Sequence, residues 1–240
     1  MIDLHTHLLP NIDDGACSIE EALKMIEALH NQKVNKIVCT PHFDPTTTSL
    51  QDFSDKRAAA ISLLSNSKVV LVSGSETTLH DYLFNYPDLS PLYIGNSRYL
   101  LLELPFGKEW DNEVFKTLES LLRYYDLFAI IAHIERYPAI KKNENNIKKL
   151  IEMGCLLQLN TNSIIDKKLR PRALKYIKRG YIDVLASDCH NMDKRPPIIN
   201  EAFNIVMQKL GTEYSDRLKY NAECIVNGSD LRQKTIYIIE

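Results

Sequence analysis

Seven short apolar runs with high β-propensity recur along the chain. The first begins at Ile2 and leads into His5 and His7, and the others cover residues 36–40, 69–73, 98–103, 127–132, 155–159 and 182–186. Apolar residues at helical spacing predict helices at 18–31, 52–66, 111–124, 143–153, 166–179, 196–210 and 214–225. This alternation predicts an α/β fold built on a parallel sheet.

The number of these units indicates which α/β fold to expect. Seven strands in 240 residues fit a distorted (β/α)7 TIM-like barrel that is closed or nearly closed. An open doubly wound sheet is the alternative. The chain has no internal repeat, low-complexity tract or interdomain linker, so we expect residues 1–240 to form a single domain.

Three positions mark expected helix ends. Ser18 is expected to cap the helix over 18–31, because it precedes two glutamates and an apolar stripe. Gly154 and Gly180 are expected just past the ends of two later helices.

Polar residues with metal-binding side chains stand at or just after six of the seven predicted strands. They are His5, His7, Asp14, His42, Glu76, Glu103, His133, Asp188 and His190. In either α/β architecture the carboxyl ends of the strands meet, so these side chains are expected to lie together. Nine ligands exceed the three that a catalytic zinc uses, which indicates two or three divalent ions.

Each of these residues also has an ordinary structural explanation, such as a hydrogen-bonded loop histidine or a solvent-facing glutamate. The joint placement of all nine at one end of one sheet favours the metal site. His30 and His80 fall in or beside helix-like segments and are expected not to be ligands. Asp13 and Gly15 are expected only to shape the turn after the first strand.

Two arginines follow these strand ends. Arg136 comes three residues after His133, and Arg195 comes seven residues after Asp188. A guanidinium fork matches the oxygens of a phosphate group, so a metal cluster with two arginines suits phosphate ester hydrolysis.

Composition and charge exclude several classes of protein. A net charge of −2 gives no overall basic footprint for nucleic acid. No apolar run approaches the roughly 20 residues of a membrane span, and no signal peptide is evident. The five cysteines are scattered and odd in number, which predicts reduced thiols and a cytoplasmic location.

The combination of these motifs resembles the PHP (polymerase and histidinol phosphatase) superfamily, and within it the capsule-locus bacterial metal-dependent tyrosine-protein phosphatases. The resemblance is carried by Met1-Ile-Asp-Leu-His-Thr-His7, Ile12-Asp-Asp-Gly15, His133-Ile-Glu-Arg-Tyr137, Ser187-Asp-Cys-His-Asn191 and Arg195-Pro-Pro197. It spans the whole chain and implies the PHP form of the distorted barrel.

The resemblance also implies how the ligands are shared. His5, His7, Glu76 and Asp188 would hold a first ion, Glu76 with Glu103 and His133 a second, and Asp14, His42 and His190 a third. The ions would be manganese, with iron or zinc as alternatives. Arg136 and Arg195 would contact phosphate, and His42 and Asp188 are expected to take part in catalysis.

The expected activity is hydrolysis of phosphotyrosine by attack of a metal-bound hydroxide. The implied partner is the tail of a bacterial tyrosine kinase of capsular or exopolysaccharide biosynthesis, and the implied assembly is a homo-oligomer. The loop 43–50 is shorter and less basic than in those capsule enzymes, so docking and assembly need not follow the family.

Three alternatives remain. The same scaffold could act on a small phosphate ester such as histidinol phosphate or a sugar phosphate. Cys189 and Arg195 match a Cys-x5-Arg spacing, which would indicate a cysteine-dependent phosphatase, although the intervening loop lacks glycine. A non-catalytic, metal-stabilised adaptor is the third.

Overall fold

Parallel strands follow one another around a curled sheet in the computed structural model, which describes residues 1–106 and 109–231. Their order is β1 (Ile2–Thr6), β2 (Lys36–Cys39) with β3 (His42–Phe43), β4 (Val70–Ser73) with β5 (Glu76–Thr78), β6 (Tyr99–Glu103), β7 (Phe128–Ile131), β8 (Leu156–Asn160) and β9 (Val184–Ala186). We call β2 with β3 the second path of the barrel and β4 with β5 the third, because each pair of strands continues one course of the chain. Neighbouring paths are hydrogen-bonded in chain order, in a sheet β1-β2-β4 and a sheet β3-β5-β6-β7-β8-β9. This consecutive order lacks the reversal of a doubly wound sheet, so that alternative is wrong.

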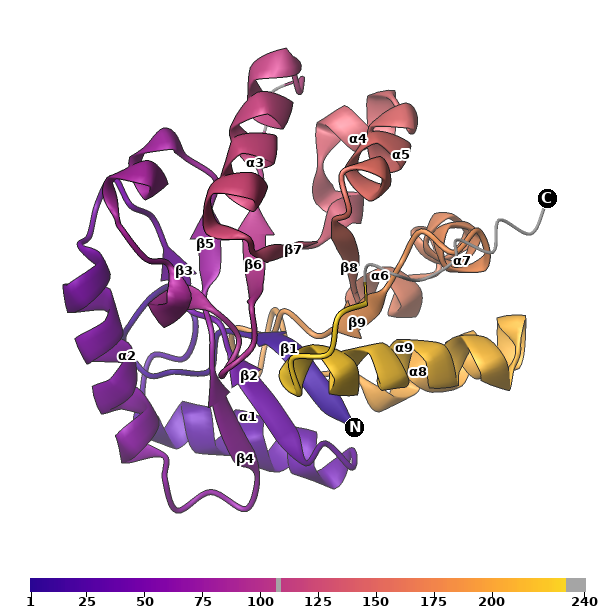
Figure 1. The fold of residues 1–240 in the computed structure, drawn as a ribbon. Helices are drawn as coiled ribbons and strands as arrows, with labels where there is room; N and C mark the ends of the chain where they lie inside the picture. The colour runs from indigo at the N-terminus through magenta and orange to yellow at the C-terminus, as the bar shows by residue number, and fades with distance from the viewer. Residues whose placement is uncertain (107–108, 232–240) are drawn as a thin grey trace.

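The last strand returns to the first. Thr6 and Cys189 form a parallel bridge. The amide of Asp188 donates to the carbonyl of His5 at 2.9 Å, and the amide of His7 donates to the carbonyl of Cys189 at 2.9 Å. The sheet therefore curls into the predicted distorted TIM-like barrel, drawn in Figure 1.

Two of the predicted strands are broken, which corrects the expectation that they end at His42 and Glu76. Pro41 has no N–H to donate and interrupts the second path, and Gly74 lies in the break of the third. His42 and Glu76 then begin β3 and β5 and pair with each other in register. Both residues stay at the carboxyl end of the barrel, because the short strands continue the same two paths.

Helices surround the strands (Figure 1). They are α1 (Ile19–Asn31), α2 (Leu50–Leu63), α3 (Asn112–Tyr125), α4 (Pro138–Lys142), α5 (Asn145–Glu152), α6 (Asn162–Ile165), α7 (Arg170–Lys178), α8 (Asn200–Leu210) and α9 (Thr212–Val226), with 3₁₀ turns η1 (Asp81–Asn85), η2 (Ser90–Leu92) and η3 (Ile134–Arg136). None of these helices is both long and apolar enough to cross a membrane.

The expected helix ends are largely confirmed. The Ser18 hydroxyl accepts from the amide of Glu21 at 3.1 Å, and Gly154 and Gly180 have φ of 81° and 73°. The helix expected at 166–179 starts later, at Arg170, because Asp166 ends α6 and its carboxylate accepts from the amides that precede α7. The final helix is longer than expected, with 15 residues.

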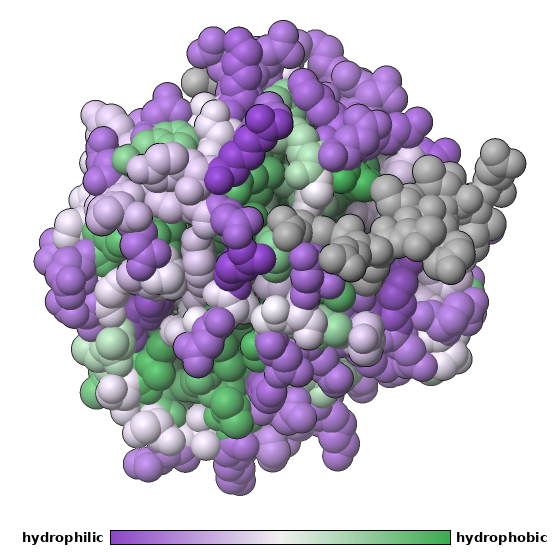
Figure 2. Space-filling model, viewed as in Figure 1, coloured by the Kyte–Doolittle hydropathy of each residue, from purple (hydrophilic) through white to green (hydrophobic). Residues whose placement is uncertain are grey.

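The side chains of each strand alternate between two apolar clusters. In β6, Leu100 and Leu102 pack in the larger cluster with the surrounding helices, whereas Tyr99 and Leu101 pack in a second cluster with Ile225 of α9. Polar side chains cover most of the face in Figure 2, and an apolar patch lies in its lower part near β2 and β4. The second apolar cluster, which includes Ile225 of α9, occupies part of the barrel. The polar residues lie at the carboxyl ends of the strands.

Candidate metal centre

The strand ends bring the predicted ligands together in three groups. The groups are His7, Asp14, His42 and His190; His5, His7 and Glu76; and Glu76, Glu103 and His133. Within each group, one nitrogen or oxygen atom of every residue lies within 4.8 Å of the others. Asp188 lies outside these groups but places Oδ1 at 3.5 Å from His5 Nε2 and 3.6 Å from His7 Nε2. All nine predicted residues therefore converge on one region.

Glu76 is the residue that connects the groups. Its Oε2 lies 3.2 Å from the nearest ring nitrogens of His5, His7 and His42, and its Oε1 lies 2.7 Å from His133 Nε2. Burial alone would raise the pKa of this carboxyl group, but the histidines around it hold the pKa well below its usual range. Glu76 is thus a buried, ionised carboxylate surrounded by imidazoles.

One ring nitrogen at the site, Nε2 of His190, has the surroundings of a metal ligand. His190 Nε2 is buried and makes no hydrogen bond, although Asp14 Oδ1 is 3.4 Å away. Burial and the charge of His7 lower the pKa of His190 to about 4, which leaves its imidazole neutral. The Nε2 atom of His190 is therefore a buried nitrogen with no hydrogen-bond partner, close to a carboxylate and other imidazoles. Such surroundings suit the binding of a divalent cation.

Asp13 contributes more than the turn that its position suggested. Its Oδ2 lies 2.7 Å from His7 Nδ1 and accepts from the amide of His42 at 3.0 Å, while its Oδ1 accepts from the amide of Gly15. Although burial opposes it, this pairing with Asp13 and Glu76 raises the pKa of His7 to about 10. A metal-binding histidine commonly donates its second ring N–H to a carboxylate, and the presence of two aspartates, Asp13 and Asp14, after His-x-His was the available signal.

Replacing Asp13 by alanine is expected to weaken metal binding by about 10- to 100-fold, because His7 loses the group that orients its ring. Asp13→Asn should recover part of the affinity, since the amide oxygen still accepts from Nδ1–H. Metal affinity measured by isothermal titration for both variants checks this. Unchanged affinity in Asp13→Ala would leave Asp13 with a turn-forming role alone.

Gln158 is a second residue that the sequence analysis missed. Its side-chain oxygen accepts from the amide of His133 at 2.6 Å and lies 3.2 Å from His5 Nδ1. Its amide nitrogen donates to Asn160, which in turn donates to Asp188 Oδ2 at 2.6 Å. This chain of contacts holds three predicted ligands from β8, and a glutamine inside the apolar strand Leu156–Asn160 was the only sequence signal.

The backbone at the site is unusual in three places. His133 and Asp188 have positive φ values of 30° and 53°, a conformation that costs of order 1–3 kcal/mol in non-glycine residues. At Gly15, a Cβ would lie 1.9 Å from the carbonyl oxygen of His7, so only glycine allows this approach. These constraints fix where His7, His133 and Asp188 point.

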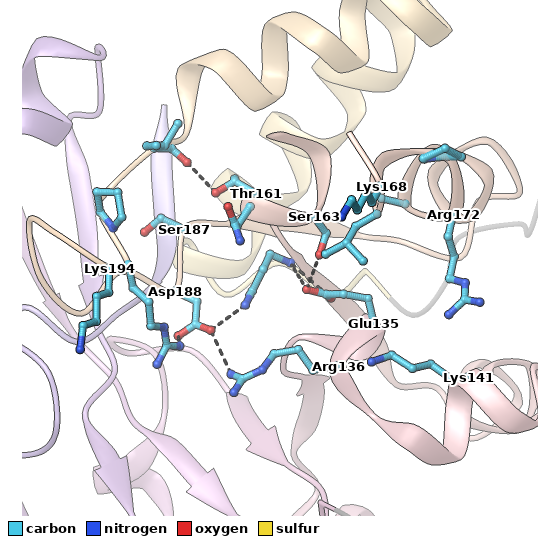
Figure 3. Close-up of a pocket in the computed structure, with 18 residues that line it drawn as sticks. Glu135, Arg136, Lys141, Thr161, Ser163, Lys168, Arg172, Ser187, Asp188 and Lys194 are labelled. Carbon is cyan, nitrogen blue, oxygen red and sulfur yellow. Dashed lines mark hydrogen bonds and ion pairs between the residues drawn. The ribbon is translucent and has the colours of Figure 1, made fainter. Parts of the chain in front are cut away.

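Arg136 and Arg195 both reach Asp188. Arg195 Nη2 lies 2.6 Å from Oδ1, and Arg136 Nη1 lies 3.3 Å from Oδ2. Their side chains remain 43% and 35% exposed, so their other donors face a cavity of about 640 Å³. Figure 3 shows both this cavity and the contact of Arg136 with Asp188.

The buried position of Cys189 argues against a cysteine nucleophile. The residue has no exposed surface, and burial raises the pKa of its thiol well above the usual value. A neutral, inaccessible thiol is a poor nucleophile. Arg195, the other half of the Cys-x5-Arg spacing, contacts Asp188.

His30 and His80, expected not to be ligands, lie outside the three groups. His30 is in the last turn of α1, and His80 Nδ1 accepts from the amide of Tyr82 at 3.1 Å. This acceptor role caps η1.

Comparison with known proteins adds a family to this geometry. Residues 1–227 match the model of the capsular polysaccharide synthesis family CpsB/CapC. The chain belongs to the CpsB/CapC family. The family assignment agrees with the resemblance to the capsule-locus phosphatases, because the matched region contains every predicted ligand.

Curated members of the CpsB/CapC family are similar over most of their length. The tyrosine-protein phosphatase CpsB of Streptococcus pneumoniae is 31% identical over 234 residues, which cover 91% of this chain and 94% of that protein. The tyrosine-protein phosphatase YwqE of Bacillus subtilis is 28% identical over 253 residues, covering 99% and 94%.

A solved structure from a study of YwqE from Bacillus subtilis and CpsB from Streptococcus pneumoniae, there called unique metal-dependent tyrosine phosphatases, has the same fold. It superposes with a TM-score of 0.84 at 26% identity, covering 95% of each chain.

Proposed function

We propose that this CpsB/CapC protein is a metal-dependent protein-tyrosine phosphatase. The observation that carries the proposal is the convergence of three ligand groups around Glu76 beside two arginines. The names of the relatives, tyrosine-protein phosphatases, support the same activity. Metal-dependent phosphoryl transfer needs this combination of clustered imidazoles and carboxylates with donors for the phosphate oxygens.

The grouping of the side chains supports the ligand sharing that the family resemblance implies. In this proposal, His5, His7, Glu76 and Asp188 would hold one ion, Glu76, Glu103 and His133 a second, and Asp14, His42 and His190 a third. Mixed imidazole and carboxylate ligands suit manganese, with iron or zinc as alternatives. When bound, such ions activate water and offset the charge on the phosphoryl oxygens.

The arginines position the phosphate in this proposal. Arg136 and Arg195 extend from the loops after β7 and β9 toward the same carboxylate, Asp188. Each guanidinium keeps free donors that can bind non-bridging phosphate oxygens, and their fixed direction orients phosphorus toward the ligand cluster. Phenolate is a relatively good leaving group, so the reaction needs little help from a general acid.

Phe106 suggests why the substrate carries an aromatic group. Its ring is 40% exposed, and it lies 5.4 Å from the ring of His133 and 4.8 Å from that of Tyr137. The guanidinium of Arg136 lies 5.1 Å from the Phe106 centroid. An exposed apolar ring next to a phosphate-binding arginine suits the phenyl ring of phosphotyrosine better than an alkyl phosphate.

Replacing Phe106 by alanine is therefore expected to raise the KM for a phosphotyrosine peptide roughly three- to tenfold, since an aromatic pair contributes about 0.5–1.5 kcal/mol. The KM for a small alkyl phosphate should change little. Steady-state kinetics on both substrates check this, with Tyr82→Ala as a control because that ring is 52% exposed and lies in η1. An equal rise in KM for both substrates would show that Phe106 does not contribute to the choice between them.

One experiment tests the proposed activity directly. Metal content and turnover of a phosphotyrosine peptide are measured on the same sample, with added manganese and after chelation. We expect manganese to support turnover and chelation to abolish it, with a higher kcat/KM for the peptide than for histidinol phosphate. The reverse preference would indicate a small-molecule phosphatase, and bound metal without turnover of any phosphate ester would indicate an adaptor.

The biological setting follows from the family. We propose that the substrate is the phosphorylated tail of a cytoplasmic tyrosine kinase domain that controls capsular or exopolysaccharide synthesis. Residues 1–240 would act as one domain and could assemble into a homo-oligomer.

A further inference from the structure

The cavity beside Asp188 extends well beyond the ligand cluster. It has a volume of about 640 Å³ and reaches from the loop after β9 to α6 and α7. A cavity of this size is in the range that holds drug-sized ligands, so it has room for more than one phosphate group. Its lining therefore bears on which substrate the site accepts.

Positive charge is concentrated in this cavity. Its cationic lining residues are Arg136, Lys141, Lys168, Arg172, Lys194 and Arg195, and its acidic ones are Glu135 and Asp188. The chain as a whole carries a net charge of −2, so this excess is local. Such a cluster attracts an anionic ligand.

The acidic residues do not neutralise the whole cluster. Asp188 is already contacted by Arg136 and Arg195. Glu135 accepts hydrogen bonds from the hydroxyl of Ser163 and the backbone amide of Asn160. Both of these hydrogen-bond donors are neutral groups.

Three of the cations lie away from the proposed phosphate site. Lys141, Lys168 and Arg172, which we call the outer cations, come from α4, the α6–α7 loop and α7. Figure 3 shows them on the side of the cavity opposite Lys194, with Arg136 and Glu135 between. Within residues 1–106 and 109–231, no carboxylate oxygen lies within 4.0 Å of their charged nitrogens.

We propose that the outer cations form a subsite for a second anionic side chain of the substrate peptide, close in sequence to the phosphotyrosine. The inference rests on the proposed phosphatase function and adds a preference within it. The second group is a carboxylate or another phosphate, because both match exposed lysine and arginine donors. Leu169, 47% exposed, and Pro171 add an apolar wall along which the peptide can lie.

The test compares three phosphotyrosine peptides that differ only beside the phosphotyrosine. One has neutral neighbours, one has glutamates and one has a second phosphotyrosine. Each is assayed with the manganese-loaded wild-type protein and with the double variant Lys168→Ala, Arg172→Ala. The double variant Lys167→Ala, Lys178→Ala is the matched control, because it removes two exposed cations from the same loop and helix outside the cavity.

We expect the wild-type protein to prefer an anionic peptide over the neutral one by roughly three- to tenfold in kcat/KM. This ratio should fall to near one in the cavity variant, persist in the control and shrink as salt rises. A preference for both anionic peptides indicates a general anion subsite, and a preference for the doubly phosphorylated peptide alone assigns the subsite to phosphate.

Equal kcat/KM for all three peptides in the wild-type protein would overturn the subsite, as would an equal loss for all three in the cavity variant. The second result would mean that the outer cations attract every phosphopeptide to the same extent and do not bind a second anionic group. Thermal melting of both variants excludes unfolding as the cause. These results differ from failure of the phosphatase proposal, in which the wild-type protein turns over none of the peptides.

Discussion

Glu76→Gln is expected to reduce manganese-supported phosphotyrosine turnover by roughly 10³-fold or more. Glu76 contacts His5, His7, His42 and His133 and belongs to two of the three ligand groups. Glutamine has a similar shape but lacks the negative charge. The substitution therefore leaves several imidazoles without the carboxylate that offsets a bound cation.

The comparison with Cys189→Ala makes this result specific to the metal mechanism. Because Cys189 is buried and its thiol is neutral, alanine should leave activity largely intact. Metal content and peptide turnover are measured for both variants. Full activity in Glu76→Gln, or inactivity of a folded, metal-loaded Cys189→Ala, would contradict the metal-centred proposal.

Arg195→Ala is expected to lower kcat/KM for the phosphotyrosine peptide by about 10²–10³-fold, the typical cost of removing one donor to a developing oxyanion. Arg195→Lys should recover only part of this loss, because lysine keeps the charge but not the planar fork. The control is Arg98→Ala, since Arg98 is exposed and pairs with Asp126 at the surface. Steady-state kinetics of the three variants measure the effect.

Loss of Arg195 also removes a cation from Asp188, which it contacts at 2.6 Å. Metal affinity must therefore be measured in the same variants. Reduced kcat/KM with unchanged metal affinity would place Arg195 on the phosphate. If the kinetic loss disappeared at saturating manganese, Arg195 would act only through Asp188.

The predictable part of the fold depends on short-range pattern. Each predicted strand and helix covers at most 15 consecutive residues, so local spacing was enough to identify them. The breaks at Pro41 and Gly74 were harder to predict from the sequence, because the second and third paths continue past them only when β3 and β5 pair in register. The start of α7 also moved, since Asp166 accepts from the amides that follow it.

The candidate site divides in the same way. The nine candidate ligands could be identified from the sequence because imidazoles and carboxylates at strand ends differ in chemical type from the apolar strands before them. Asp13 and Gln158 were missed because their importance depends on partners and burial. Gln158 contacts His5 although the two residues are 153 positions apart in the sequence, and a contact over that separation cannot be predicted from a local pattern.

By itself, the sequence determined the strand and helix order, the residues that can bind metal and the two arginines that can bind phosphate, because these follow from local periodicity and side-chain chemistry. Only the tertiary structure decided how Glu76 links the ligand groups, that Cys189 is buried and that the outer cations share a cavity with Asp188. Those facts depend on which segments meet when the parallel strands curl into a barrel.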